Sequence, residues 1–425
     1  MITLKQGGHH LFSQNDSVAT TVREVLEDVR LNGLDAVRRR AGETWQRTSY
    51  ELTPDDIQSA CNQVPLSVKE DIAFCQEQIR RFAQCQRDAL HDVEVEALPG
   101  AVLGHKLIPV QRVGCYVPGG RYPLVASAYM SIVTARVAGV ESIVAATPPR
   151  QGMGWNPAII YSIHTSGADR ILCVSGVEAL AMMAYGVAGI QPVDMLVGTG
   201  GAYIIEAKRQ LYGLCGIDLI AGPSELLIVA DETADPALVA CDLLAQAEHD
   251  TEAGLCLVTT SKTIAESVAN QIEKQLVDLP TRDVAAVSWR DNGIIVIVDN
   301  ADEAIDYANS YAPEHLELHV RDKDYYSANL RNYGAMFLGE ETTVAYGDKA
   351  IGTNHILPTG RGARYTGGLW VGMFLKACSY QHTARSASVR IARVTERICE
   401  VEGMPGHARS ARKRIERFEN DQDQE

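Results

Sequence analysis

The pattern of apolar positions divides the chain into a helical first part and a longer part in which strands and helices alternate. Apolar residues recur at three-to-four spacing over 17–46 and again over 71–90, which predicts amphipathic helices. From about Arg112 onward, short apolar runs rich in β-branched residues alternate with helical patterns. This alternation is typical of parallel sheets whose strands are joined by crossover helices.

The alternating part contains two successive series of strands and helices. The strand candidates of the first series are GCYVPGG, SIVAAT, RILCVSG and DMLVG, and those of the second are ELLIVAD, GLCLVTT, GIIVIV and AMFLG. Clusters of Gly and Pro at 118–123, 148–157 and 221–223 are candidate linkers. We therefore expect an α/β protein with two doubly wound sheets, each parallel.

Length, charge and cysteine usage exclude several function classes. A chain of 425 residues that is 46% hydrophobic can form two or three domains. Its formal net charge of -15 disfavours binding to nucleic acid or to an anionic membrane. The short basic run at 409–417 is interleaved with Glu416, as in a solvated helix face. Scattered cysteines without a CxxC pair, no signal-peptide pattern and no apolar run of about 18 residues indicate a cytoplasmic protein.

Four short polar clusters could carry chemistry, and the first two place an imidazole near an amide or a carboxylate. In DLLAQAEHDTE, Gln246 and His249 lie three residues apart on one face of a predicted helix. They could ligate zinc or make only structural hydrogen bonds. In YAPEHLEL, Glu314 and His315 follow a proline. This pair offers two proton acceptors of different basicity to a reaction with two deprotonations, although a surface turn fits the pattern as well.

The other two clusters lie in segments punctuated by glycine. GDKAIGTNHILPTG contains Asp348 and His355 on a predicted loop, which suits ligand or substrate contacts better than core packing. EGMPGH contains Glu402 and His407 around a Gly-Pro turn near the C-terminus, where segments often fray. Together the four clusters supply oxygen and nitrogen ligands without thiolates, a mixture that suits catalytic zinc.

The residues themselves provide no fingerprint for a nucleotide. The run GTGGAY at 198–203 comes nearest to G-x-G-x-x-G but lacks its spacing, and the sequence has neither a P-loop nor a G-x-S-x-G elbow. These motifs alone therefore do not predict a nicotinamide cofactor.

The order of the motifs resembles that of the histidinol dehydrogenase family. The resemblance covers about 17–417 and rests on YVPGG (116–120), GPSE (222–225), DLLAQAEH (242–249), APEHLE (312–317), GTNHILPT (352–359) and EGMPGH (402–407). It implies a homodimer with an active site shared between subunits. It also implies two incomplete Rossmann-like, doubly wound domains of aldehyde dehydrogenase-like topology, with small terminal segments. The expected boundaries are an N-terminal arm at 1–14, a first α/β domain at 15–116 and 225–369, a nucleotide-side domain at 117–224, and a dimer-exchange segment at 370–425.

The resemblance further implies a reaction and a set of residues for it. Such enzymes oxidise a small alcohol through its aldehyde to the acid, with zinc and two NAD. His315 would take the alcohol proton and Glu314 would activate water. The implied zinc ligands are Gln246, His249 and Asp348, together with His407 from the partner subunit. The implied substrate contacts are Ser224, His355 and Glu402, and Tyr116 is retained on the cofactor side.

The chain departs from the family pattern on both sides of this site. On the cofactor side, Glu178 stands in Gly-Val-Glu-Ala where the family usually has Gly-Ala-Gln-Ala, and Gly201 ends Gly-Thr-Gly-Gly where it usually has Gly-Pro-Gly-Asn. Both changes would alter the hydrogen bonds to NAD. On the substrate side, Arg121 and the stretch 363–376 resemble the sulfopropanediol dehydrogenase branch, which oxidises 2,3-dihydroxypropane-1-sulfonate to sulfolactate. Arg121 could contact the sulfonate or only cap a turn.

Four alternatives stay open beside this substrate, and one of them is another small polar alcohol. The retained Glu402 and His355 favour oxidation of L-histidinol to L-histidine. A zinc hydrolase without nicotinamide, with Glu314 as the base for water, would explain the missing glycine fingerprint. A non-catalytic metal-binding dimer would keep the ligands but has no reason to keep Glu314 and His315 adjacent.

Overall fold

The computed structural model describes residues 1–8, 16–41, 49–120, 122–150 and 154–419. They form two compact units. The larger unit comprises Met1–Cys85 and Val110–Phe374, and the smaller unit comprises Gln86–Pro109 and Leu375–Glu425. Arg121 and part of the arm expected at 1–14 lie outside the described residues.

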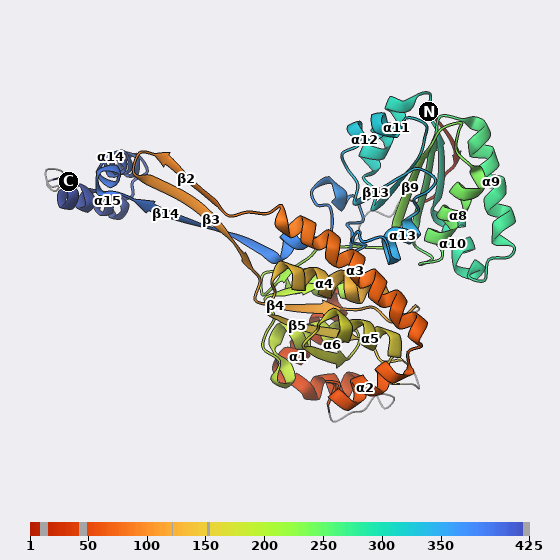
Figure 1. The fold of residues 1–425 in the computed structure, drawn as a ribbon, viewed down its shortest axis with the longest axis horizontal. Helices are drawn as coiled ribbons and strands as arrows, with labels where there is room; N and C mark the ends of the chain where they lie inside the picture. Colours follow the sequence, from red (N-terminus) through yellow and green to blue (C-terminus); the bar gives the residue numbers. More distant parts are fainter. Residues whose placement is uncertain (9–15, 42–48, 121, 151–153, 420–425) are drawn as a thin grey trace. The chain divides into compact units, whose positions relative to one another are not determined.

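The larger unit contains a six-stranded sheet that is covered on both faces (Figure 1). Its strand order is β1-β11-β10-β9-β12-β13, with β1 antiparallel to β11 and the other neighbours parallel. In β9, Leu226 and Ile228 belong to one apolar core, whereas Leu227 and Val229 belong to another. Burial on both faces explains why β9 is a continuous apolar run rather than an alternating one. The strands are β1 (Ile2–Lys5), β9 (Glu225–Ala230), β10 (Gly254–Thr259), β11 (Gly293–Ile297), β12 (His315–His319) and β13 (Ala335–Leu338).

Two groups of helices supply the apolar residues that pack on this sheet. Many start with a side chain that caps the first turn; for example, Asp235 Oδ1 accepts a hydrogen bond from Ala237 N at 2.7 Å and Pro236 occupies the first position of its helix. The first core is completed by α8 (Pro236–Ala247), α9 (Lys262–Leu276), α10 (Arg282–Asn292) and α13 (Val344–Lys349), and the second by α11 (Ala301–Tyr311) and α12 (Lys323–Asn329).

The larger unit also contains a five-stranded parallel sheet with the order β6-β5-β4-β7-β8. Its helix α4 is buried over 126–135, as expected for a helix packed on all sides. The N-terminal helix α1 packs against α6 and α7, and α2 packs against α5. The strands are β4 (Arg112–Tyr116), β5 (Ser142–Thr147), β6 (Arg170–Cys173), β7 (Met195–Val197) and β8 (Gly216–Ile217). The helices are α1 (Asp16–Ala41), α2 (Pro54–Gln63), α3 (Leu66–Asp88), α4 (Val125–Ala138), α5 (Pro157–Ser166), α6 (Gly176–Tyr185) and α7 (Ala202–Leu211), and short 3-10 turns are η2 (Val187–Gly189), η3 (Gly362–Arg364) and η4 (Val371–Phe374).

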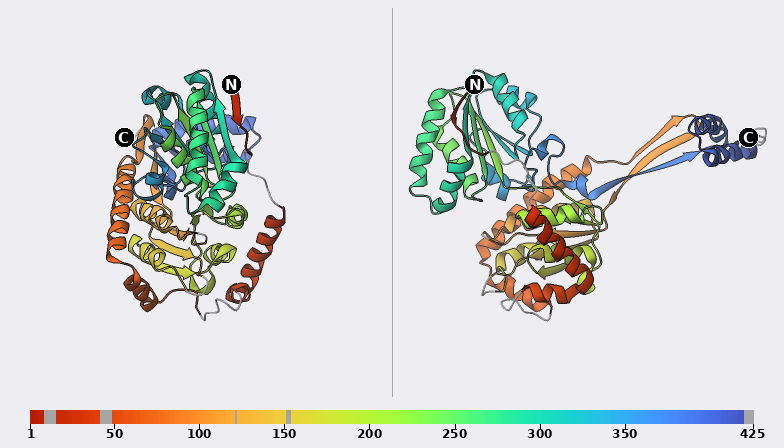
Figure 2. Two further views of the ribbon diagram at one scale, coloured as in Figure 1. Left: turned by 90° about the vertical axis from the view of Figure 1, so that its right-hand side faces the viewer. Right: turned by 180° about the vertical axis from the view of Figure 1, so that it is seen from behind.

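The smaller unit consists of a three-stranded antiparallel sheet and a helical hairpin. The strand order is β14-β3-β2, and Figure 2 shows the three strands running side by side. The helices α14 and α15 pack against each other. None of the described helices, in either unit, combines the length and the apolar character that a membrane span needs. The elements are β2 (Val93–Leu98), β3 (Ala101–Pro109), β14 (Leu375–Thr383), α14 (Arg385–Val401) and α15 (Pro405–Phe418).

The α/β class with two doubly wound sheets is confirmed, but several details differ from the expectation. The six-stranded sheet is not wholly parallel, because β1 joins its edge antiparallel to β11. The strand β4 pairs with β5 and β7, so the change of sheet falls before Arg112 and not after Tyr116. The Pro-Gly turn at 118–120 therefore follows a strand of the second sheet and does not separate two domains. The segment expected at 370–425 is joined by β2 and β3, which pair with each other and with β14.

Candidate active site

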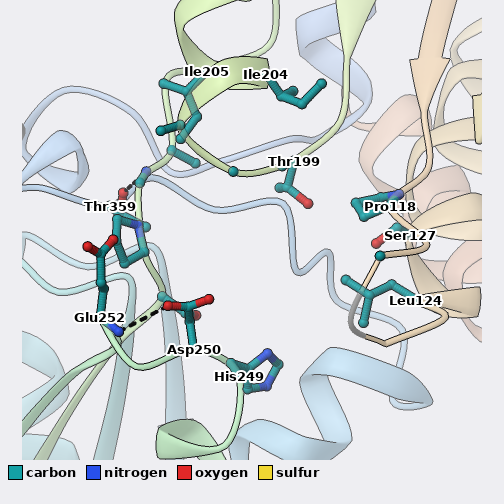
Figure 3. A pocket seen from close by; sticks show the side chains of 18 of the residues that line it. Pro118, Leu124, Ser127, Thr199, Ile204, Ile205, His249, Asp250, Glu252 and Thr359 are labelled. Carbon is teal, nitrogen blue, oxygen red and sulfur yellow. Dashed lines mark hydrogen bonds between the residues drawn. The ribbon is translucent and has the colours of Figure 1, made fainter. Parts of the chain in front are cut away.

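A cavity of about 1000 Å³ in the larger unit is lined by the ends of strands from both sheets. The five-stranded sheet contributes the carboxyl ends of its strands, where a parallel sheet usually binds its ligand. The six-stranded sheet contributes the amino ends of β9, β10 and β12. Figure 3 shows Thr199, Pro118 and His249 around this cavity. Residues that follow β4, β5, β6 and β7 are Pro118, Pro148, Ser175 and Thr199, and those at the amino ends are Ser224, Gly254, Glu314 and His315.

Glu314 and His315 lie at the start of β12, and both are buried. Glu314 Oε2 accepts hydrogen bonds from Ser224 Oγ at 2.6 Å and from Glu225 N at 2.9 Å. His315 Nδ1 lies 3.3 Å from the same carboxylate oxygen and 2.9 Å from the backbone oxygen of Glu225. The pair predicted from APEHLE is thus held in place by the residues that begin β9, and it faces the cavity.

The two ring nitrogens of His315 have different surroundings. Nδ1 can donate its proton to the Glu225 carbonyl, which leaves the lone pair of a neutral ring on Nε2. Nε2 is buried, has no hydrogen-bond partner among the described residues and lies 3.7 Å from Asp348 Oδ1. Burial works against a charge on this ring, but Glu314 and Asp348 outweigh it and raise the pKa of His315 well above its usual value. Nε2 is therefore the basic atom that this side chain offers to the cavity.

Three of the four predicted zinc ligands lie close to this pair. His249 Nε2 lies 3.5 Å from Asp348 Oδ2, and both residues line the cavity. Burial lowers the pKa of His249, which favours the neutral ring that ligates metals. Burial works to raise the pKa of Asp348, but His315 outweighs it and holds this pKa below its usual range. Gln246 is buried on the same helix face and donates through Nε2 to Ser224 Oγ, which leaves its amide oxygen for a cation.

This donor set fits zinc on chemical grounds. An imidazole, a carboxylate and an amide oxygen are hard or borderline ligands, and three protein ligands with a further position open are typical of catalytic zinc. The fourth predicted ligand, His407, lies on α15 of the smaller unit, where it is exposed, and Glu402 is exposed at the end of α14. Their assignment to this site stays a prediction.

The cofactor-side residues lie around a glycine loop. Tyr116 and Gly201 both line the cavity, whereas Glu178 lies in the first turn of α6 and is not among the described lining residues. Burial raises the pKa of the Glu178 carboxyl. The loop 198–201 leads directly into the N-terminus of α7, whose residues Ala202 and Ile204 also line the cavity. The sequence lacks the dinucleotide fingerprint, yet the fold presents a helix N-terminus of the kind that binds phosphate groups.

The predicted substrate contacts are partly brought together. Ser224 and His355 line the cavity. His355 Nδ1 lies 3.0 Å from Asp348 O and its Nε2 lies 3.0 Å from Ser127 Oγ. Burial lowers the pKa of His355. Arg121, which was predicted as a sulfonate contact, lies outside the described residues.

A second buried polar cluster was missed by the sequence analysis. His319 Nε2 lies 3.4 Å from Glu317 Oε2 and 3.8 Å from Asp242 Oδ2, close enough for the three side chains to hold a cation. The signal in the sequence is periodicity: Glu317 and His319 follow His315 at alternate positions of one strand, and Asp242 precedes Gln246 by about one helical turn. These residues are distinct from the predicted zinc ligands.

Comparison with known proteins identifies the family. The two-sheet α/β fold carries a buried acid–imidazole pair beside a set of nitrogen and oxygen donors, which is an arrangement suited to acid–base chemistry next to a metal. The chain belongs to the histidinol dehydrogenase family, whose family model matches residues 11–415. The recognition made from the motifs is thereby confirmed.

Individual relatives extend over nearly the whole chain. A histidinol dehydrogenase homolog of Shouchella clausii is 49% identical over 98% of this chain and 99% of its own length. The sulfopropanediol 3-dehydrogenase of Ruegeria pomeroyi is 45% identical over 96% of this chain and 95% of its own length. The crystal structure of histidinol dehydrogenase from Elizabethkingia anophelis matches with a TM-score of 0.91 at 29% identity, over 96% of this chain and 94% of that one.

Proposed function

We propose that this chain catalyses the zinc-dependent, NAD-linked oxidation of a small primary alcohol through its aldehyde to the carboxylate. The favoured substrate is 2,3-dihydroxypropane-1-sulfonate, with sulfolactate as the product. The observation that carries the proposal is the buried Glu314–His315 pair, with His315 Nε2 aimed toward Asp348 in a cavity that a glycine loop also lines. The likeness to the sulfopropanediol 3-dehydrogenase of Ruegeria pomeroyi supports the substrate.

The residues that would hold zinc are Gln246, His249 and Asp348, with His407 of the partner subunit as the fourth. When bound, zinc would polarise the alcohol oxygen and NAD would accept a hydride in each half of the reaction. The Nδ1–H of His315 is held by the Glu225 carbonyl, so Nε2 can take the hydroxyl proton of the alcohol while the ring keeps its orientation.

Glu314 serves the second half of the reaction. Its carboxylate is oriented by Ser224 Oγ and Glu225 N, and it would take a proton from the water that adds to the aldehyde carbon. The alcohol, one water and two NAD⁺ then give the carboxylate, two NADH and three protons. The three protons leave the alcohol hydroxyl, the water as it adds to the aldehyde, and the carboxylic acid product; His315 would take the first and Glu314 the second, and the acid ionises on its own.

The glycine loop 198–201 and the N-terminus of α7 support a site for NAD. The first amides of a helix have no partner within the helix and can bind the pyrophosphate. Gly201 has open space where a side chain would begin, so a ligand can approach the backbone closely. Tyr116 Oη, at 3.4 Å from Gly176 N, would border the same site.

We also infer a homodimer with a shared active site. In the smaller unit Val394, Ile398 and Val401 form an exposed apolar stripe at helical spacing on α14, and Val93 and Val95 are exposed on β2. Such a surface is suited to a second copy of the chain, and the partner subunit's His407 and Glu402 would then reach the metal and substrate. Unpaired cysteines and the use of NAD agree with a cytoplasmic location.

L-Histidinol is the second candidate substrate. The family model and the histidinol dehydrogenase of Elizabethkingia anophelis favour it, and His355 and Ser224, both predicted substrate contacts, line the cavity. Both substrates need the same pair of bases, so the choice between them concerns only the part of the cavity beyond the reacting carbon.

Kinetics with zinc-loaded protein tests the proposal. NADH formation is measured with 2,3-dihydroxypropane-1-sulfonate, L-histidinol and a neutral diol at saturating NAD, and we expect two NADH per sulfonate consumed and a higher kcat/KM for the sulfonate than for L-histidinol. A higher kcat/KM for L-histidinol would reverse the choice of substrate. Cleavage of esters or amides, with no NADH from any alcohol, would replace the proposal by a zinc hydrolase.

A further inference from the structure

The cavity is rich in carboxylates and has few cations, and this balance bears on which substrates it can take. Among the described lining residues, the acidic side chains outnumber the basic ones, which are Arg209 and Lys349 apart from histidines. A substrate with a fixed negative charge would be repelled from such a cavity unless a cation receives that charge. Among the described residues, these two basic side chains are therefore the candidates to receive the charge of an anionic alcohol.

Arg209 is already neutralised. Its Nε and Nη2 donate to the two carboxylate oxygens of Glu206, each at 2.7 Å. This bidentate pair lies on α7, the helix that follows the glycine loop, and so belongs to the nucleotide side of the cavity. Binding a substrate anion there would require breaking two charge-assisted hydrogen bonds.

Lys349 is placed differently. Its ammonium lies 3.6 Å from Asp348 Oδ2, beyond hydrogen-bond distance, and this is its ion pair among the described residues. The side chain is about half exposed, at 53%. Its backbone, in contrast, is fixed, because Tyr129 Oη donates to Lys349 O at 2.6 Å and His355 holds the preceding carbonyl at 3.0 Å. The backbone of Lys349 is thus fixed beside the predicted metal ligands, whereas its ammonium group can move.

We propose that Lys349 is the receptor for an anionic group on the substrate, such as a sulfonate, phosphate or carboxylate carried near the alcohol. This inference rests on the proposed function, because it needs Asp348 to ligate the metal. A carboxylate that is bound to a dication attracts a neighbouring ammonium less, and the ammonium then pairs with the next anion available. The same ammonium disfavours a substrate that brings a protonated amine, so Lys349 selects anionic alcohols over amino alcohols.

Calorimetry with zinc-loaded protein and without NAD tests this binding apart from turnover. The variants are Lys349→Gln, the conservative Lys349→Arg, and Lys262→Gln as a matched control at a lysine of α9 whose side chain is 74% exposed. For 2,3-dihydroxypropane-1-sulfonate and glycerol 3-phosphate we expect Lys349→Gln to raise the Kd roughly 10- to 100-fold, with most of the affinity restored by arginine. The ratio of kcat/KM for the sulfonate to that for propane-1,2-diol should fall by a similar factor.

The outcomes separate this inference from the proposed reaction. Three results would each overturn the role of Lys349. The first is an equal loss of kcat/KM on charged and neutral diols, the second is loss of zinc from Lys349→Gln, and the third is unchanged binding of both anions. If the wild type oxidises the sulfonate and Lys349→Gln does so equally well, the reaction stands and the receptor does not. If the anions bind through Lys349 but no alcohol reduces NAD, the receptor stands and the proposed reaction fails.

Discussion

At the scale of single residues, the two proposed bases of the site can be tested separately because the proposal assigns them to different steps. His315→Asn should lower oxidation of the alcohol on the order of 10²- to 10⁴-fold and spare oxidation of the aldehyde, since the first step alone needs Nε2. Glu314→Gln should do the reverse, because its amide cannot accept a proton from water. Steady-state rates with the alcohol and with the aldehyde as separate substrates measure the division.

The matched control for both variants is Ser224→Ala, which removes one hydrogen bond to Glu314 and leaves both bases in place. It should lower aldehyde oxidation by a smaller factor than Glu314→Gln does. Equal losses on alcohol and aldehyde in both base variants would contradict the assignment of one base to each step.

The sequence predicted which residues of this site matter, but not how they are connected. The spacing of Gln246 and His249 on one helix face, and the adjacency of Glu314 and His315, could be read directly from the chain. The link between them could not, because Gln246 bonds Ser224 and Ser224 bonds Glu314 only after α8, β9 and β12 have packed. Such tertiary hydrogen bonds join residues far apart in the sequence and leave no local pattern.

At the scale of elements, a buried ion pair holds the glycine loop of the proposed NAD site. The side chains of Lys208 and Asp218 are 4% and 0% exposed, and they pair with each other. Lys208 Nζ donates to Gly198 O at 2.8 Å, and Gly198 N donates to Asp218 Oδ2 at 2.8 Å. Gly198 has a φ of 123° and lies against the Tyr116 carbonyl, where a side chain would not fit. The pair therefore fixes both polar groups of a glycine that no other residue can replace.

We predict that Lys208→Met raises the KM for NAD by at least about 10-fold while the KM for the alcohol changes little, because the loop borders the proposed cofactor site and not the proposed metal site. It should also lower the free energy of unfolding by about 3–5 kcal/mol, since Asp218 is left buried without its partner. Arg112→Met is the control, because its ion pair with Asp194 is partly exposed and lies at the amino end of β4. Parallel rises in both KM values would refute the specific role in cofactor binding.

The cluster of Asp242, Glu317 and His319 makes the stability of the six-stranded sheet depend on pH. Burial, with repulsion from Glu317, raises the pKa of Asp242 to about 6. Burial opposes a charge on His319, but Glu317 and Asp242 outweigh it and raise its pKa. Both groups bind a proton more tightly in the folded protein than in the unfolded chain. Their contribution is therefore complete at low pH and is lost as the pH rises, for Asp242 between about 4 and 6.

Asp242→Asn should accordingly flatten the fall in stability between pH 4 and pH 6.5. Over this range the change in the free energy of unfolding relative to the wild type should be on the order of 2 kcal/mol, because the variant has no carboxylate to ionise at this largely buried position. The amide oxygen of Asn can keep the hydrogen bond from Thr343 Oγ1, which spares the packing. Thermal denaturation across this pH range, with Glu266→Gln on α9 as the control, measures the effect. Identical pH profiles for the Asn variant and the wild type would contradict the contribution of this cluster to the pH dependence of stability.

The same cluster shows why one strand escaped the sequence analysis. The strands β9 and β10 consist mainly of consecutive apolar residues, and this pattern predicts burial on both faces. The strand β12 reads HLELH, and its polar residues indicate a turn until their partners are known. Glu317 Oε1 accepts from Val344 N at 2.7 Å, and His319 Nε2 lies 3.8 Å from Asp242 Oδ2, so some of the partners of these buried polar groups come from other elements. The alternation of Val and Glu in β2, by contrast, is a pattern that indicates a strand, and the sequence analysis did not use it.

At the scale of the whole molecule, the proposed dimer and the proposed metal site depend on each other. His407 lies exposed on α15, in the unit that carries the apolar stripe of α14, so a proposed zinc ligand belongs to the unit proposed for dimerisation. Metal bound by both subunits would contribute to association, because any ligand that binds the dimer and not the monomer stabilises the dimer.

His407→Ala should therefore weaken zinc binding and the dimer together. We expect zinc content after dialysis to fall below half of that of the wild type, and the dimer dissociation constant measured by sedimentation to rise at least about 10-fold; chelation of zinc from the wild type should shift the dimer in the same direction. His91→Ala, at another exposed histidine of the smaller unit, is the matched control and should change neither quantity. A purely structural role of His407 would alter association alone. If the variant dissociates but keeps its full zinc content, all metal ligands must lie within one chain, and the proposal of a shared site fails.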